Sequence, residues 1–254
     1  MNSTSHSSSS RTVPETRFGV WFQSSRLWNQ YVLTPALEEL VQLADGLIPV
    51  APVVFDAGCG HGAGLEWIAT RLRPSRLHAI DDDARLIEEA RARASRLPLH
   101  SDVRRGELGL IDLDDASVDV VICHQTLHHV TDQEGALREL RRVLRPGGAL
   151  LLAESCWPFL RKLPVKLFFR HPPSARRVAR DYLRLLDRHG FEVERRRTAF
   201  PRPFWTLVRQ GEEPDSETAP LCHVAAVRRP NEEVDSAERL ALRVKMAEGP
   251  EERS

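Results

Sequence analysis

Residues 53–70, VVFDAGCGHGAGLEWIAT, constrain the fold of this chain more than any other stretch. A short apolar, β-branched run ends at an acid, four glycines follow within seven residues, and an amphipathic helical pattern comes next. Glycines at a strand-to-helix turn let backbone N–H groups approach a ligand closely, and the helix N-terminus adds partial positive charge. The stretch therefore predicts a ligand site at the end of a buried strand.

The alternation of strands and helices continues along the chain. Strands are expected at residues 52–56, 76–81, 99–107, 117–125, 149–155, 191–200 and 221–230, and helices at 64–72, 83–94, 132–144 and 174–190. This spacing predicts an α/β fold, in which a parallel sheet has helices on both faces. Ligands bind such sheets outside the carboxyl ends of the strands, at the topological switch point.

The chain length and its apolar content of 41% suffice for one α/β domain with additions. Within its helical parts, Thr34 is expected to be an N-cap before Pro35, and Gly190 is expected to end the last helix. The expected parts are a disordered Ser-rich tail at 1–15, an N-terminal helical cap at 16–50, a main domain at 51–230 with an insertion or lid at 156–175, and a charged tail at 231–254.

Charge and cysteine content argue against several classes of protein. Thirty-six basic residues balance thirty-six acidic ones, so nucleic acid is not expected as the main partner. The four cysteines form no CxxC pair and indicate reduced thiols. The N-terminus has no apolar signal region, and no segment reaches about 18 uninterrupted apolar residues. We therefore expect a cytoplasmic protein without a membrane span.

Three acids at strand ends narrow the choice of ligand. The glycine loop alone also satisfies a relaxed dinucleotide fingerprint. Asp56, however, ends the first strand, where it would accept hydrogen bonds from an ammonium group and repel a pyrophosphate. Asp81 ends the second strand, where an acid can bind ribose hydroxyls, and Glu107 ends the third, where it could accept an exocyclic amine. An amino acid, a ribose and an adenine in this order describe S-adenosylmethionine.

On these residues the chain resembles the class I S-adenosylmethionine-dependent methyltransferases, by motif from about residue 52 to 154 and by topology to 230. The stretch LRELRRVLRPGGALLLAE is similar to the helix, turn and fifth strand of that family. The resemblance implies a Rossmann-like, seven-stranded, mostly parallel sheet whose last strand, at 221–229, is antiparallel. It implies S-adenosylmethionine as the cofactor, bound by Asp56, Gly58, Gly60, Gly62, Asp81, Asp82, Glu107, Leu108 and His124. At Glu107 and Leu108 the family usually has Asp and Ala.

Methyl transfer in this family needs little beyond alignment of a nucleophile, although a general base helps where the acceptor must lose a proton. His124, at the end of the fourth strand, is the candidate catalytic contact. Glu154, at the end of the fifth, either faces the acceptor or caps a neighbouring loop. His128 and His129 are expected to be structural. No metal site is expected, because the ligand-like spacing of His124 and His128 has no carboxylate or third histidine at hand.

Aromatic residues of the cap and the insertion are expected to roof the acceptor side of the cleft: Trp21, Phe22, Trp28, Trp157, Phe159, Phe168 and Phe169. Residues 161–209 carry fourteen Lys and Arg against four Asp and Glu. This surplus fits attraction of an anionic or lipid-like acceptor, or peripheral contact with a membrane. A solvated, Arg-rich helix face is the favoured interpretation. The expected partner is a small-molecule acceptor, hydrophobic or anionic.

We therefore predict a methyltransferase that transfers a methyl group from S-adenosylmethionine to an O, N or C atom of a small organic acceptor. Two alternatives stay open. One is an NAD(P)-dependent oxidoreductase, for which a Tyr-x-x-x-Lys pair and a separate substrate domain are missing. The other is a non-catalytic S-adenosylmethionine-binding regulatory protein, which would bind the cofactor without turnover.

Overall fold

The computed structural model of this protein describes residues 16–201 and 215–230. The tails expected at 1–15 and 231–254 lie outside the described residues. Within the described ranges, no helix combines the length and the apolarity that crossing a bilayer requires.

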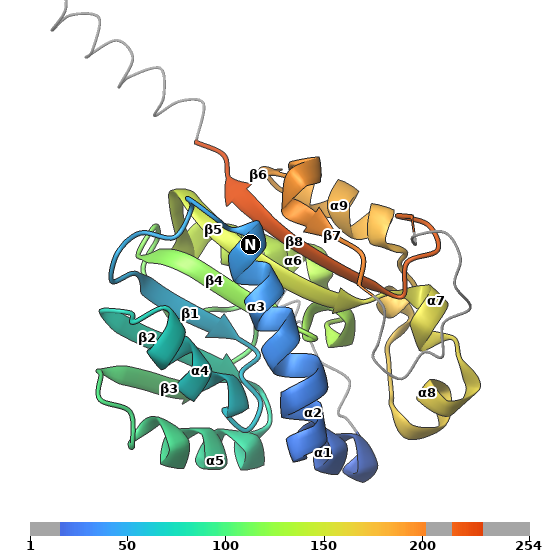
Figure 1. The fold of residues 1–254 in the computed structure, drawn as a ribbon, viewed down its shortest axis with the longest axis horizontal. Coiled ribbons are helices and arrows are strands. Elements are labelled where there is room, and N and C mark those ends of the chain that lie inside the picture. Colours follow the sequence, from blue (N-terminus) through green and yellow to red (C-terminus); the bar gives the residue numbers. More distant parts are fainter. Residues whose placement is uncertain (1–15, 202–214, 231–254) are drawn as a thin grey trace, which may run out of the picture.

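One mixed sheet forms the centre of the described structure (Figure 1). Its strands are β1 (Val53–Ala57), β2 (Arg76–Asp81), β3 (Ser101–Arg105), β4 (Val118–His124), β5 (Leu144–Ser155), β6 (Phe191–Glu192), β7 (Thr198–Ala199) and β8 (Leu221–Arg228). The order is β3-β2-β1-β4-β5-β8-β6, and β7 also pairs with β8. Strands β1 to β5 run parallel, whereas β8 is antiparallel to β5, as expected. The switch point lies at β1, which has β2 on one side and β4 on the other.

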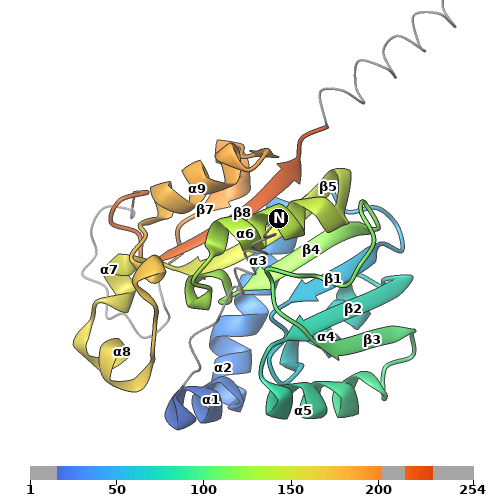
Figure 2. The ribbon, with the colours of Figure 1, turned by 180° about the vertical axis from the view of Figure 1, so that it is seen from behind.

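Helices cover both faces of this sheet (Figures 1 and 2). They are α1 (Arg17–Gln23), α2 (Arg26–Trp28), α3 (Thr34–Leu43), α4 (Ala63–Arg71), α5 (Ala84–Ala94), α6 (Gln133–Val143), α7 (Trp157–Leu160), α8 (Leu163–Phe168) and α9 (Ala179–Arg188). Shorter turns are η1 (Asn29–Leu33), η2 (Leu127–His129), η3 (Pro173–Ala175) and η4 (Arg195–Arg197). Helices α3, α4 and α5 pack on one face, and α6 and α9 on the other.

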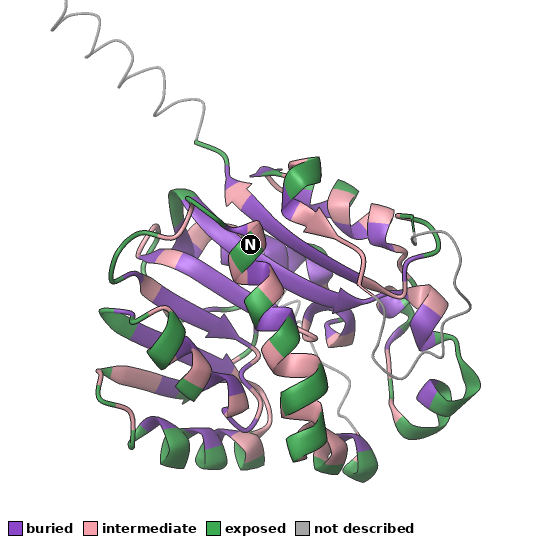
Figure 3. Ribbon diagram, in the orientation of Figure 1, coloured by how far each residue is buried: buried purple, intermediate pink, exposed green. Residues whose placement is uncertain are grey.

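The strand residues build two apolar layers. Val54 and Ile122 belong to the layer beneath α3, α4 and α5, whereas Phe55 and Val121 belong to the layer beneath α6 and α9. Side chains alternate between the faces of a strand, so the continuous apolar runs of β1 and β4 fill both layers at once. Figure 3 shows the inner strands buried along most of their length. This packing fixes the strand ends on which the site is built.

The N-terminal segment differs from the expectation at Thr34. Leu33 before it is helical (φ −67°, ψ −58°), and the chain runs from α2 through the π-type turn η1 directly into α3. The N–H of Thr34 donates to the carbonyl of Asn29, five residues earlier. Pro35 lacks an N–H, so one regular α-helical bond is missing here and a wider turn precedes it. Thr34 is therefore not an N-cap, and that prediction was wrong.

The strand expected at 191–200 is interrupted by η4, so the described sheet has eight strands instead of seven. Arg197 in this turn is buried, and its Nη1 donates to the carbonyls of Leu43 and Asp45 at 2.8 and 3.0 Å. A buried guanidinium requires such acceptors, and these bonds attach the interrupted strand to the end of α3. Gly190 (φ +77°) follows the end of α9, as expected.

Candidate active site

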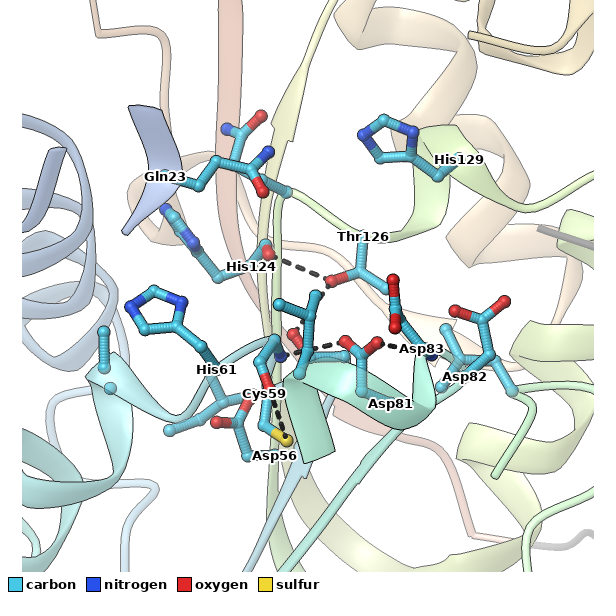
Figure 4. Close-up of a pocket in the computed structure, with 18 of the residues that line it drawn as sticks. Gln23, Asp56, Cys59, His61, Asp81, Asp82, Asp83, His124, Thr126 and His129 are labelled. Atoms are coloured by element: carbon cyan, nitrogen blue, oxygen red, sulfur yellow. Dashed lines mark hydrogen bonds between the residues drawn. The ribbon is translucent and has the colours of Figure 1, made fainter. Parts of the chain in front are cut away.

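A cavity of about 520 Å³ opens at the carboxyl ends of β1, β2 and β4 (Figure 4). This is the edge of the sheet where ligands of such folds bind. Of the residues that the sequence analysis assigned to the cofactor, Gly62 does not line the cavity. The others are all in its wall: Asp56, Gly58, Gly60, Asp81, Asp82, Glu107, Leu108 and His124.

The glycines of the loop between β1 and α4 meet different demands. Gly58 (φ +95°) is so close to Thr126 that a Cβ would come within 2.3 Å of its side chain. Gly62 (φ +81°) would place a Cβ 2.8 Å from Ala90 Cα, so it serves the packing of α4 on α5. Gly60 (φ +55°) has no atom within 4 Å of its missing Cβ, and it lines the cavity. A ligand can therefore approach the backbone at Gly60.

Asp81, at the end of β2, fixes this loop. Its Oδ2 accepts a hydrogen bond from the N–H of Gly60 at 2.8 Å, and its Oδ1 accepts one from the N–H of Asp83 at 3.0 Å. Burial raises the pKa of Asp81, and the two N–H donors oppose that rise. Each carboxylate oxygen has a second acceptor direction, so Asp81 can also bind hydroxyl groups of a ligand.

Two further acids line the same cavity. Asp56 is buried, and burial, followed by the charge of Asp81, raises its pKa to about 7. The same two causes, in the same order, raise the pKa of Asp82 to about 6. Asp83 caps α5 by accepting a hydrogen bond from the N–H of Arg85 at 2.8 Å. With Asp83 and Glu107, five acidic residues line this cavity, and they favour a ligand with ammonium and hydroxyl groups over a pyrophosphate.

The turn after β4 is held in an uncommon conformation. Gln125 has φ +53°, which is the left-handed region that side chains other than glycine rarely adopt. Its N–H donates to the carbonyl of Ala153 at 2.7 Å, and its Oε1 accepts from Ser155 Oγ at 2.5 Å. Both partners lie on β5, which therefore holds a strained residue against the cavity.

Glu154 supports this turn and does not line this cavity, so of the two roles expected for it the structure agrees with the loop cap and not with the acceptor-facing role. Its carboxylate accepts three backbone N–H bonds of 2.7–3.2 Å from residues 126–128. It also lies 2.5 Å from His128 Nδ1, and the side chain is fully buried. Burial raises the pKa of Glu154 to about 8, and the three N–H donors oppose that rise. We infer that Glu154 caps the loop.

A second cavity, of about 400 Å³, adjoins the first. Segments far apart in the sequence close it, since α1 meets α8 with 4.5 Å between the ring centroids of Phe18 and Phe168. Its aromatic wall contains Phe18, Phe22, Trp28, Tyr31, Phe159, Phe168 and Phe169. Five residues line both cavities: Gln23, Trp28, His124, Gln125 and His129. The two cavities therefore share a wall.

Two tryptophans expected in this wall lie elsewhere. Trp21 is 65% exposed and lines neither cavity. Trp157 also lines neither, and its ring lies 5.5 Å from the charged groups of both Lys166 and Arg176. The aromatic wall is formed by the rings that turn inward from α1, α2, η1, α7 and α8, and by Phe169 directly after α8.

His124 lies in the shared wall, where the sequence analysis expected it (Figure 4). Its ring is 6.3 Å from that of Trp28, nearly perpendicular to it. Burial, followed by nearby His223 and His128, lowers the pKa of His124 to about 3, so the imidazole is neutral at neutral pH. Its Nε2 is buried with no hydrogen-bond partner among the described residues. A buried polar atom of this kind points to a ligand group.

Several wall residues were missed from the sequence. Gln23, Gln125 and Thr126 belong to no motif, and only the folded chain brings them together. His61 lies inside the glycine loop, and its Nε2 is buried without a partner in the described part of the chain. Its place between two motif glycines was the signal that could have identified it.

Comparisons with known proteins agree with this geometry. Residues 55–152 match a family model described as a methyltransferase domain. The "Probable S-adenosylmethionine-dependent methyltransferase" of Mycolicibacterium smegmatis is 37% identical over 144 residues, 56% of this chain and 52% of that protein. An uncharacterized 37.1 kDa protein in transposon TN4556 of Streptomyces fradiae is 41% identical over 107 residues, 42% of this chain and 31% of that protein. The chain thus spans about a third to a half of these relatives.

Solved structures show the same fold. A methyltransferase of Haloferax volcanii, in complex with the methyltransferase activator Trm112, matches with a TM-score of 0.66 at 18% identity, covering 84% of this chain and 96% of that one. The described sheet order, with its antiparallel strand β8, agrees with this likeness. Residues 55–152 therefore correspond to a methyltransferase domain, the described fold is that of S-adenosylmethionine-dependent methyltransferases, and S-adenosylmethionine is the cofactor that this family implies.

Proposed function

We propose that this protein transfers a methyl group from S-adenosylmethionine, bound in the first cavity, to an apolar small molecule bound in the second. One observation carries the proposal: a cavity with acids at three strand ends shares a wall with a cavity of aromatic rings. The chemistry takes place at that wall, where His124 and Gln125 lie.

The residues of the first cavity fit the cofactor. Asp56 would hold the ammonium group, beside the open space at Gly60. Asp81 would accept hydrogen bonds from the ribose hydroxyls in its remaining acceptor directions. Glu107 would accept a hydrogen bond from the exocyclic amine of the adenine. Bound there, the cofactor supplies a methyl group on a sulfonium centre, which is a good leaving group.

The chain's own contribution is alignment. Holding a nucleophile near 3 Å from the reacting carbon can contribute about 7–11 kcal/mol. His124 is neutral and, with a pKa of about 3, a weak proton acceptor. We therefore infer that its Nε2 orients the acceptor by a hydrogen bond instead of removing its proton.

The second cavity favours an apolar acceptor over an anionic one. Seven aromatic side chains line it, and no Lys or Arg of the described residues does. The Lys and Arg residues that the structure describes between positions 161 and 201 therefore do not line this cavity. An acceptor with an aromatic or aliphatic body and one reactive heteroatom fits this lining.

Two measurements test the proposal. Calorimetry with S-adenosylhomocysteine and with NAD⁺ should give binding of the first alone. Incubation with S-adenosylmethionine labelled in its methyl group and a pool of apolar hydroxy, amino and thiol compounds should give a labelled product. Binding without turnover over such pools would favour a regulator, and binding of NAD⁺ alone would overturn the proposal.

A further inference from the structure

Three histidines gather where the second cavity meets the first. His128 and His129 lie on η2, and His171 lies between α8 and η3, 42 residues after His129. One ring nitrogen of each lies within 4.8 Å of those of the other two. All three line the second cavity, and His129 also lines the first. The cluster is therefore next to the reacting groups of the proposed function.

A carboxylate lies next to one histidine of the cluster, as it commonly does beside a metal-bound histidine. Nδ1 of His128 lies 2.5 Å from Oε2 of Glu154, whose side chain is fully buried. In metal sites a histidine usually donates its second ring N–H to a carboxylate, which fixes the ring and raises its basicity. With Nδ1 in this bond, Nε2 is the nitrogen of His128 that can coordinate an ion.

The three rings also lie against one another. The ring centroids are 4.3–5.2 Å apart and the ring planes are tilted by 27–40°, an arrangement that aromatic stacking alone would also give. Stacking explains the contacts between the rings but not the bond between His128 Nδ1 and the carboxylate of Glu154.

We propose that His128, His129 and His171 bind a divalent transition-metal ion such as Zn²⁺, with one coordination position open to the aromatic cavity. Three protein ligands and an open position are typical of catalytic zinc sites. Zn–N bonds of about 2.0–2.1 Å would place the nitrogens about 3.3 Å apart, so the separation of two ring nitrogens must decrease by up to about 1.5 Å. The sequence analysis expected no metal site because a carboxylate and a third histidine were not at hand, and the folded chain supplies both.

The role of such an ion rests on the proposed function. A hydroxyl or thiol of the acceptor bound at the open position would have its pKa lowered by the ion and would release its proton to water. The ion would thus do the work of a general base. The acceptor class is thus an apolar molecule with a hydroxyl or thiol group.

Zinc binding by the full chain, with any affinity tag removed, tests the site. The protein would be titrated with Zn²⁺ against a chromogenic chelator, and the bound metal counted by elemental analysis. We expect one equivalent in the wild type, and at least a 100-fold weaker affinity in His129→Ala and His171→Ala. Glu154→Gln, which changes a positioning residue, should weaken binding by about 10- to 100-fold. His100→Ala, at an exposed histidine outside the cluster, is the matched control.

A second readout separates this proposal from the proposed function. Co²⁺ bound in place of zinc should give the visible spectrum of a tetrahedral site in the wild type and lose it in His171→Ala. Circular dichroism and S-adenosylhomocysteine affinity should stay unchanged in that variant, which would show an intact fold and cofactor site. Equal zinc binding in the wild type and His171→Ala, or less than one equivalent in the wild type, would overturn the metal site. Failure of the wild type to bind S-adenosylhomocysteine would instead overturn the proposed function.

Discussion

The backbone N–H of Gly60 donates a hydrogen bond of 2.8 Å to Oδ2 of Asp81. This bond joins the glycine loop after β1 to the acid at the end of β2, so the two parts of the cofactor cavity hold one another in place. A second bond, from the N–H of Asp83 to Oδ1 of Asp81, ties the same carboxylate to the start of α5. Variants at these positions should therefore separate effects on the fold from effects on the ligand.

Gly60→Ala should impair cofactor binding much more than stability. No atom lies within 4 Å of the added Cβ, so the fold has room for it. The stability should fall by only about 1 kcal/mol, because alanine adopts a positive φ less readily than glycine. The methyl group would, however, enter the space through which a ligand reaches the backbone. Gly58→Ala is the contrast, because its Cβ would come within 2.3 Å of Thr126 and should lower the melting temperature as well. Thermal unfolding and calorimetry with S-adenosylhomocysteine check both, and unchanged affinity in Gly60→Ala would contradict the prediction.

Asp81→Ala should weaken cofactor affinity by about 2–4 kcal/mol, which is roughly 30- to 1000-fold in Kd. The change removes the proposed ribose acceptor and also frees the N–H of Gly60. Asp83→Ala, two residues away in the same wall, removes a helix cap and an ion pair with Arg85, and it should cost about 1 kcal/mol of stability with most of the affinity retained. Calorimetry of the pair decides between a ligand contact and a general effect on the fold. Equal losses of affinity in both variants would argue against the ribose assignment.

The ends of three strands could be predicted from the sequence. The apolar runs of β1, β2 and β4 end where the structure ends them to within about a residue, because burial on both faces and the following glycine or acid are local signals. Asp83 as the cap of α5 is equally local, since a capping side chain bonds a backbone N–H two residues later. This is why the positions of Asp56 and Asp81 in the cavity wall could be anticipated.

What could not be anticipated depends on contacts between distant segments. Gly58 excludes a side chain because Thr126 fills that space, and Gln125 holds a positive φ because β5 bonds it. His171 meets η2 only after the insertion folds over the second cavity. Trp21 was misplaced for the same reason, since periodicity indicates that a residue lies on a helix but not which neighbour will cover it.

Asp56 should make cofactor affinity fall as the pH falls. The pKa of its carboxyl in the free protein is raised to about 7, mainly by burial, and an ammonium group would bind its charged form. The ammonium keeps its charge between pH 5 and 8, so the Kd of S-adenosylhomocysteine should rise below pH 7 by up to about tenfold per pH unit. Asp56→Asn should bind weakly with little pH dependence. Asp82→Asn, which removes the carboxyl whose pKa is raised to about 6, is the control for the neighbouring acid.

The same group makes an opposite prediction for the stability of the free protein. A folded-state pKa of about 7 against 3.8 in the unfolded chain means that the folded protein holds this proton more tightly. Its contribution to stability is therefore fully present below about pH 4 and is lost as the pH rises to 7, an upper bound of about 4 kcal/mol. Asp56→Asn should raise the melting temperature of the ligand-free protein at pH 8. A lower melting temperature at that pH would show that the carboxylate has a partner that stabilises its charged form.

His124→Ala should lower turnover with cofactor affinity largely retained. The ring lies in the wall between the two cavities, and its unpartnered Nε2 is the atom that we infer to orient the acceptor. Loss of a positioned polar contact of this kind should lower kcat by about 100-fold, while Asp56 and Asp81 would still hold the cofactor. His124→Gln, which restores a polar side chain, should recover part of the rate, and its kcat should show no inflection between pH 5 and 8 from this position. Turnover equal to that of the wild type in His124→Ala would remove the residue from the site, and a parallel loss of S-adenosylhomocysteine affinity would make it a cofactor ligand instead.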